Sequence, residues 1–405
     1  MSNHGEIGDR GRGRKGVRAR LAIATAAAVA ILYGVQGLTA ALPSVQSEFG
    51  VSDTALGLFT AAYMLPAVVF AIPLGWLADT LGRRRVFVVA AVLFSVAGGA
   101  QAWAPDFETL LALRFVQGVG FGALMPLTVT LIGDALRGAK QLRAQASRQV
   151  AMTLGEFAMP LIGAALLAIS WRAPLAAQFA LLLLAVGGAL VLDDEHQPGG
   201  ASRAYARELT GAVRGPGMGG VLVAGFLRFW CKFALLTYAP TLLIQERGAS
   251  PLEAALVVSV ASLVAAVSGT QSVRVLRHVA ASRLLATAIV LSGAGLIAIA
   301  IAPTWPLALV ASVVFGVGDG WLMVMQNSIV TEAAPPAVRA GLVGVNSMVR
   351  NAGKLAAPLA IGAFVLVAPL SLALVAVAGT AWALVPVVAR ARAFDDALGG
   401  HVRDE

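Results

Sequence analysis

Long apolar stretches recur along nearly the whole chain, and each has about the length that a helix needs to cross a bilayer, roughly 20 residues. They lie at 21–43, 55–78, 86–104, 109–132, 149–170, 173–192, 219–244, 253–273, 284–302, 305–330, 343–367 and 370–389. The sequence therefore predicts an all-α membrane protein with twelve transmembrane helices, for which the lipid bilayer is the main solvent.

Composition agrees with a membrane-embedded chain. Of the 405 residues 58% are hydrophobic and 13% are charged, with a mean hydropathy of +0.81, so the polar side chains are too few to cover a water-soluble globule. The net charge of +9 resides mostly in short connections and not on one basic face, which argues against nucleic-acid binding.

The basic residues also predict the orientation of the chain. They precede the first apolar stretch or follow the second and fourth: Arg10, Arg12, Arg14, Lys15, Arg18, Arg20; Arg83, Arg84, Arg85; Arg137, Lys140, Arg143. The connections at 48–53 and 106–108 carry acids and no Lys or Arg. By the positive-inside rule, both termini are expected in the cytoplasm. The expected location of the chain is a bacterial-type inner (plasma) membrane. The apolar run 21–42 exceeds a signal-peptide core of about 7–15 residues, so we interpret it as an uncleaved helix.

A polar segment divides the twelve stretches into two sets of six. Charged residues together with Pro198, Gly199, Gly200 and Pro216 interrupt the apolar pattern, and the segment is long enough for a short surface helix. The predicted parts are a basic tail 1–20, a first bundle 21–192, a linker 193–218, a second bundle 219–390 and a tail 391–405.

An internal repeat supports this division. The sequence QGVGFG at 117–122 has the counterpart FGVGDG at 315–320, and a Gly precedes a Pro by five residues at both 155–160 and 353–358. Two pseudo-symmetric six-helix bundles that rock about a central substrate site are thus expected, with alternating access as the mechanism. The alternative for most of these glycines is that they only allow helices to pack closely in lipid.

Three motifs lie in the first half. The sequence GWLADTLGRRR at 75–85 follows the second stretch, RFVQGVG at 114–120 lies in the fourth, and GEFAMPLIGA at 155–164 lies in the fifth. In the first motif, two glycines permit a turn at the membrane surface and an acid can pair with a nearby Arg, which suggests a conformational latch made of Gly75, Asp79, Gly82, Arg83 and Arg84.

By these motifs the whole chain resembles the major facilitator superfamily, in particular its twelve-helix drug/proton antiporter group. The resemblance implies that Asp79, Arg83 and Arg84 stabilise an outward-facing state and that Arg114 takes part in proton coupling. Thr80 departs from the first motif, and Met159 and Ala164 replace glycines of the antiporter motif, which weakens the inference of export.

Ionisable residues inside the predicted spans are candidates for function because burying a charge in lipid is costly. They are Glu156, Arg228, Lys232, Asp319, Arg350 and Lys354, with Arg114 nearer the end of a span. The basic residues at 228 and 232, and those at 350 and 354, are four apart, so each pair shares a helix face. Two interpretations remain open: Glu156 and Asp319 form fixed ion pairs that hold helices together, or one of them exchanges a proton during transport.

Spans one, seven and ten line the cavity in the family that the chain resembles. The substrate-binding candidates on these spans are Tyr33, Gln36, Arg228, Trp230, Lys232, Trp321 and Gln326. Arg350 and Lys354 of the eleventh stretch are further candidates, because a cavity lined by both basic pairs would be electropositive.

We expect the chain to export small organic molecules by proton antiport; the alternative is a proton-coupled importer or an organic-anion transporter of the same fold. A membrane enzyme or a metal site is not expected, because His4, His196, His278 and His401 all lie outside the spans. A phosphate-binding G-x-x-x-x-G-K-[ST] motif does not occur, and Cys231 is the single cysteine. Small-molecule substrates and protons are the expected partners of a monomer without a cofactor.

Overall fold

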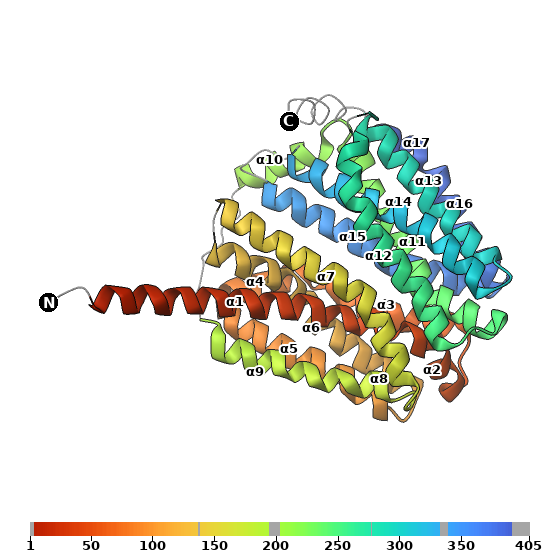
Figure 1. Cartoon of the computed structure of the whole chain (residues 1–405), viewed down its shortest axis with the longest axis horizontal. Helices are drawn as coiled ribbons and strands as arrows, with labels where there is room; N and C mark the ends of the chain where they lie inside the picture. Colours follow the sequence, from red (N-terminus) through yellow and green to blue (C-terminus); the bar gives the residue numbers. More distant parts are fainter. Residues whose placement is uncertain (1–3, 137, 194–202, 277, 333–338, 391–405) are drawn as a thin grey trace.

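The computed structural model describes residues 4–136, 138–193, 203–276, 278–332 and 339–390, and these residues form helices joined by short connections without any strand (Figure 1). The first half comprises α1 (His4–Gln36), η1 (Thr39–Ala41), α2 (Leu42–Phe49), α3 (Asp53–Val69), α4 (Ala71–Leu81), α5 (Arg83–Ala100), η2 (Gln101–Trp103), α6 (Phe107–Ala135), α7 (Gly138–Leu167), α8 (Ala173–Ala176), η3 (Ala177–Leu181) and α9 (Leu182–Val191). The second half comprises α10 (Arg203–Arg214), α11 (Met218–Thr241), η4 (Leu242–Glu246), α12 (Pro251–Leu276), α13 (Ala281–Ile301), α14 (Trp305–Glu332), α15 (Arg339–Phe364), α16 (Leu370–Ala383) and α17 (Val385–Val388).

The helices reproduce the predicted spans. Within the described ranges, 10 helical segments are long and apolar enough to cross a membrane. The apolar helix α3, of 17 residues, and the 26-residue α15, which carries Arg350 and Lys354, correspond to the remaining two predicted stretches. The predicted all-α membrane fold is confirmed, and the surface helix expected in the linker is α10. Helix α1 begins at His4, so most of the predicted basic tail is helical.

Helix ends and breaks follow from local sequence. Asp106 caps α6 by accepting a 2.7 Å hydrogen bond from the backbone amide of Thr109. Ser250 and Glu253 cap the start of α12 reciprocally, with backbone-to-side-chain bonds of 2.7 and 3.3 Å. Pro73 has no amide hydrogen to donate to the preceding turn, which explains why α3 and α4 are separate helices on one predicted span.

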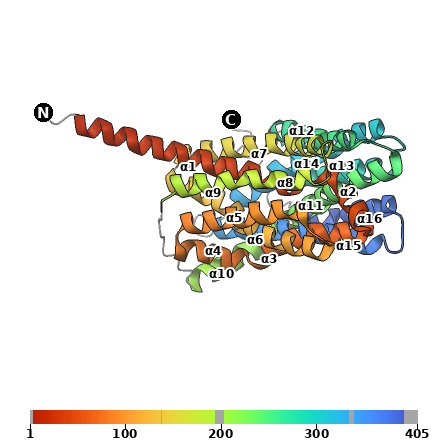
Figure 2. The same ribbon diagram turned by 90° about the horizontal axis from the view of Figure 1, so that it is seen from below.

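The two halves of the chain form two helix bundles that lie side by side (Figures 1 and 2). In the first, α6 packs against α1, α3 and α5, and α1 also packs against α7. In the second, α14 packs against α12 and α13, and α11 packs against α15. Figure 2 shows α1 extending beyond the first bundle toward the N-terminus.

The repeated glycines pack in the same way in both bundles. A Cβ atom at Gly120 of α6 would lie 2.6 Å from the backbone oxygen of Ala90 in α5, and one at Gly318 of α14 would lie 2.5 Å from that of Ala288 in α13. These glycines allow equivalent helix backbones to meet, so the interpretation of close packing is supported for both.

The bundles meet along α3 with α15 and α7 with α12, while α11 contacts η1 and α2. Hydrogen bonds between the bundles join Thr54 to Gly362 (2.7 Å), Thr60 to Thr237 (3.4 Å), Tyr238 to Asp53 (3.3 Å) and Gln245 to Gln46 (2.9 Å). In the described part of the chain, these bonds lie toward the end of the molecule that carries α2.

Candidate functional site

Four of the predicted intramembrane charges meet in one network at the interface of the bundles. Arg228 of α11 donates two hydrogen bonds to Asp319 of α14, from Nε to Oδ1 at 2.6 Å and from Nη2 to Oδ2 at 3.2 Å. Lys232, one turn further along α11, donates to Asp319 Oδ2 at 3.3 Å and to Glu156 Oε2 of α7 at 2.8 Å. The predicted shared face of Arg228 and Lys232 is thus confirmed.

The two carboxylates of this network differ in exposure. The side chain of Asp319 is 3% exposed and contacts two bases, whereas that of Glu156 is 19% exposed and contacts Lys232. Asp319 pairs within its own bundle, while Glu156 joins α7 of the first bundle to α11 of the second. The pairing of buried charges offsets the cost of removing them from water.

The other two predicted bases, Arg350 and Lys354, lie close to an aromatic ring beside this network. Arg350 Cζ lies 5.0 Å and Lys354 Nζ lies 4.7 Å from the ring centroid of Phe229, and Arg228 Cζ lies 4.8 Å from the same centroid. Lys354 Nζ is also 6.0 Å from the ring centroid of Phe121 in α6. Arg350 and Lys354 therefore share a face of α15, as predicted, and cations of α11 and α15 converge on Phe229.

Arg114 lies in a separate buried cluster of the first bundle. Its guanidinium carbon is 4.3 Å from the ring centroid of Phe59 and 4.4 Å from that of Tyr63. Its Nη1 donates to Gln117 Oε1 at 2.8 Å. Gln117 in turn contacts two more buried glutamines, Gln101 and Gln178.

The remaining substrate-binding candidates are spread over the molecule. Tyr33 donates to the backbone oxygen of Pro174 at 3.0 Å, inside the first bundle. Trp230 donates to Val377 O and Thr380 Oγ1, both at 3.1 Å, and therefore lies against α16. Neither contact directs the side chain to the charge network.

Three other candidates carry buried polar atoms. Gln326 donates to Asn346 Oδ1 at 2.6 Å. The Oε1 atom of Gln36 and the Nε1 atom of Trp321 are buried without a hydrogen-bond partner in the described part of the structure. Their role in substrate binding stays a prediction.

The predicted latch is only partly as expected. Gly82 has φ +92°, which places it in the turn between α4 and α5. The expectation that Gly75 also forms the turn is wrong, because Gly75 lies inside α4. Arg83 forms an ion pair with Asp134 of α6, and Arg84 donates to Ala189 O of α9 at 2.6 Å. The side chain of Asp79 lies outside the described structure.

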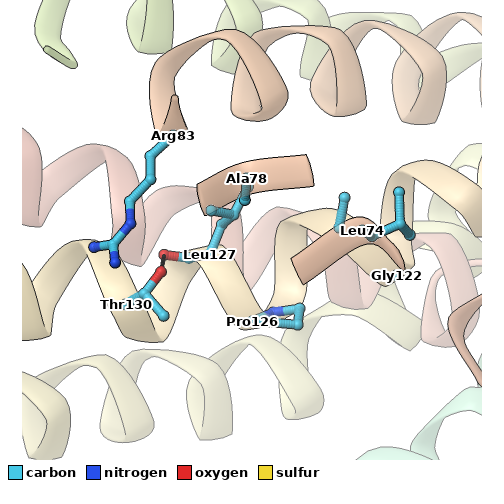
Figure 3. A pocket seen from close by; sticks show the side chains of 8 residues that line it. Leu74, Ala78, Arg83, Gly122, Pro126, Leu127 and Thr130 are labelled. Carbon is cyan, nitrogen blue, oxygen red and sulfur yellow. Dashed lines mark hydrogen bonds between the residues drawn. The ribbon is translucent and has the colours of Figure 1, made fainter. Parts of the chain in front are cut away.

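A small pocket of about 120 Å³ adjoins this latch (Figure 3). It is lined by Leu74, Ala78, Arg83, Gly122, Ala123, Pro126, Leu127 and Thr130. Its lining comes from α4, the start of α5 and α6, so it belongs to the packing of the first bundle and not to the charge network.

Sequence reasoning missed several polar partners. Asp134 follows the fourth predicted stretch, where a polar residue is expected in a connection. An acid near a helix end that is close to a basic helix start such as Arg83 is nevertheless a signal for an ion pair. Arg148 precedes the fifth stretch, yet it is 6% exposed and donates to Thr128 Oγ1 from Nε at 3.1 Å and from Nη2 at 2.7 Å. Phe229 carried no sequence signal, because its role depends on three cations from two helices.

Comparison with known proteins places the chain in a family. The profile of the Major Facilitator Superfamily matches residues 24–358 and 221–397. Among curated relatives, the puromycin resistance protein pur8 of Streptomyces alboniger is 31% identical over 199 residues (49% of this chain and 39% of the relative). The multidrug efflux pump LfrA of Mycolicibacterium smegmatis is 32% identical over 157 residues (38% and 31%). The 4-hydroxybenzoate transporter PcaK of Pseudomonas aeruginosa is 38% identical over 92 residues (23% and 20%).

The alignments with these three relatives span at most 39% of the relatives' own lengths. Solved structures match over the whole fold. A bacterial homolog of the human lysosomal transporter Spinster, in an inward-facing and unoccupied conformation, aligns with a TM-score of 0.73 at 17% identity over 96% of both chains. A POT family transporter in complex with 5-aminolevulinic acid aligns with a TM-score of 0.76 at 12% identity over 95% of this chain and 96% of that one. The chain belongs to the Major Facilitator Superfamily and is a multi-pass membrane transporter, not an enzyme.

Proposed function

We propose that this transporter couples the movement of small organic molecules to protons and that Glu156 carries the proton. The ion pair between Glu156 and Lys232 is the observation that supports this most directly, because it connects the two bundles that must move during alternating access. When Glu156 takes up a proton, it loses its charge and this ion pair. Lys232 then retains its ion pair with Asp319, which belongs to the same bundle. Protonation therefore weakens a contact between the bundles and leaves this contact within the second bundle intact.

Asp319 is better suited to a fixed structural role. It is 3% exposed, and Arg228 binds both of its oxygens. Removing one partner of a buried ion pair leaves an uncompensated charge, which makes protonation of Asp319 costly. The two interpretations drawn from the sequence thus apply to different residues: Asp319 as a fixed partner and Glu156 as the proton carrier.

The interbundle bonds support a cavity that opens away from the α2 end. Among the described residues, hydrogen bonds between the bundles are found from the Lys232–Glu156 pair as far as the Gln245–Gln46 pair, in which Gln46 belongs to α2. With the predicted orientation, the closed end faces outside and the open end faces the cytoplasm. The outward-facing state would require the α3–α15 and α7–α12 contacts to separate.

For the direction of transport, two candidates have support. Export by proton antiport is favoured by the names of two relatives, a puromycin resistance protein and a multidrug efflux pump. Movement of organic anions together with protons, as in uptake, is favoured by the four bases that face two acids at the site, and a relative named a 4-hydroxybenzoate transporter agrees with it.

The test is proton flux in liposomes that contain the purified protein, followed with a pH-sensitive dye. Cationic drugs, neutral lipophiles and organic anions are added in turn to one side. Glu156→Gln is expected to abolish substrate-triggered proton movement, whereas Glu108→Gln, at an exposed acid in the first turn of α6, is the control and keeps it. Flux that persists unchanged in Glu156→Gln with the same pH dependence would show that another group carries the proton.

A further inference from the structure

The charge network together with the two bases beside it, Arg350 and Lys354, contains four bases and two acids. The carboxylates of Asp319 and Glu156 are engaged by Arg228 and Lys232. In the described structure, Lys354 forms no ion pair and no hydrogen bond, and its ammonium lies 4.7 Å from the ring centroid of Phe229 and 6.0 Å from that of Phe121.

The surroundings of Lys354 increase this local positive charge. It lies within electrostatic range of three other cations, Arg350, Arg228 and Lys232, and of one acid, Glu156. A charged ammonium in the low-dielectric interior is costly without a compensating negative group, and aromatic faces provide only part of that compensation. Lys354 is nevertheless partly exposed, so a small molecule between the bundles can reach it.

We propose that Lys354 binds the anionic group of the transported molecule and that Phe229 and Phe121 contact its apolar body. The substrate class is then a small organic monoanion with an aromatic ring, such as an aromatic carboxylate. The carboxylate supplies the counter-charge that Lys354 lacks. The ring packs against the exposed parts of Phe229 and Phe121, which are 8% and 7% exposed and whose ring centroids lie 4.7 and 6.0 Å from the ammonium. This inference rests on the proposed function, because it assigns a substrate to the same proton-coupled site.

The position of Glu156 also determines the sign of coupling. An ionised Glu156 near Lys354 opposes the binding of an anion, and protonation removes that opposition. Linkage is reciprocal, so the bound anion also favours protonation of Glu156. Proton and anion therefore bind together and move in the same direction, which selects the second of the two candidate directions.

Binding to the purified full-length protein tests the substrate class without any ion gradient. The probes are a panel of aromatic carboxylates, each with the neutral amide and the amine of the same ring, and the readout is ligand-induced thermal stabilisation at several pH values. Carboxylates are expected to bind at least about tenfold more tightly than their amides and more tightly at lower pH. Glu156→Gln should bind them tightly at every pH.

Two substitutions assign this binding to Lys354. Lys354→Gln should lose the preference for carboxylates over amides, whereas Lys140→Gln, at an exposed lysine of α7, should keep it. Without ligand, Lys354→Met should raise the melting temperature, because it removes an uncompensated charge. Equal binding of carboxylates and amides to the wild-type protein, or an unchanged preference in Lys354→Gln, would overturn the proposal, as would a melting temperature of Lys354→Met well below the wild type.

The failure of this inference is distinguishable from the failure of proton coupling. Carboxylate binding that depends on Lys354 without proton flux in liposomes would contradict the coupling and leave the substrate class standing. Proton flux triggered by cations and absent with anions would contradict the substrate class and leave the coupling at Glu156 standing.

Discussion

The carboxylate of Glu156 and the ammonium of Lys232 are 76 residues apart in the chain and lie 2.8 Å apart across the interface of the two bundles. The same ammonium lies 3.3 Å from Asp319, which belongs to its own bundle. Lys232 can therefore exchange one partner for the other without leaving the network. Under the proposed function, protonation of Glu156 removes the bond across the interface and leaves the bond within the second bundle.

The first prediction tests the fixed role proposed for Asp319 against the proton-carrying role proposed for Glu156. Asp319→Asn leaves Arg228 and Lys232 without their shared counter-ion and should cost about 3–5 kcal/mol of stability, as expected when a buried ion pair loses one partner. Glu156→Gln should cost less, because Lys232 retains Asp319 and the Glu156 side chain is 19% exposed. Thermal unfolding of the two purified variants measures the difference.

A double variant provides the control for this comparison. Asp319→Asn combined with Arg228→Met removes both members of the bidentate pair and should recover part of the lost stability. If Glu156→Gln is instead the less stable single variant, the assignment of a fixed role to Asp319 is wrong.

The second prediction concerns the latch of the first bundle. Arg83 at the start of α5 and Asp134 near the end of α6 form an ion pair beside the pocket in Figure 3. Asp134→Asn should slow transport while ligand binding remains, because the pair holds the ends of helices and does not touch the charge network. Transport rates in liposomes and thermal-shift binding measure the two effects separately.

Arg143→Ala is the matched control, since it removes an exposed base on the neighbouring α7. It should leave the transport rate within about twofold, as expected for a surface charge. A transport rate of Asp134→Asn equal to that of Arg143→Ala would exclude a conformational role for the Arg83–Asp134 pair.

Apolar length and small-residue repeats were sufficient to predict the fold. Helix spans depend on local hydropathy, so the twelve stretches could be placed without any tertiary information. Gly120 and Gly318 fall at the same place in each repeat, and both allow close contact with an adjacent helix. The placement of Arg228 and Lys232 on one face of a helix followed from their spacing alone.

Side-chain partners across helices could not be predicted in the same way. The choice of Asp319 as the partner of Arg228 depends on how α11 and α14 pack, with 91 residues between the two positions. Trp230 was a reasonable cavity candidate by its span, but its indole lies against α16 because helix rotation is set by packing. Asp134 and Arg148 were overlooked since both lie at the ends of spans, where polar residues are usually hydrated.

The third prediction tests the aromatic support of Arg114. The guanidinium lies 4.4 Å from the ring centroid of Tyr63, and this contact is buried. Tyr63→Leu and Arg114→Gln should each lower stability, and the double variant should lose less than the sum, with a coupling of about 1 kcal/mol. A double-mutant cycle on thermal unfolding measures this coupling, and strictly additive losses would show that the ring and the guanidinium act independently.

The last prediction concerns the α2 end of the molecule, where hydrogen bonds join the two bundles. A Cβ atom at Gly57 of α3 would lie 2.5 Å from the backbone oxygen of Pro358 in α15 and 2.7 Å from Tyr238 Oη in α11. Gly57→Ala should therefore separate the bundles at the α2 end and shift the population toward the state that is open there.

The measurement is the labelling rate of Gln36→Cys by a membrane-impermeant maleimide, in a chain that also carries Cys231→Ser so that the introduced thiol is the one that reacts. Gly379→Ala is the control because a Cβ atom there would meet no other atom within 4 Å. Faster labelling in Gly57→Ala alone is expected, since Gln36 is 4% exposed while the end is closed. Equal labelling of the two variants would mean that the α3–α15 contact does not control access from the α2 end.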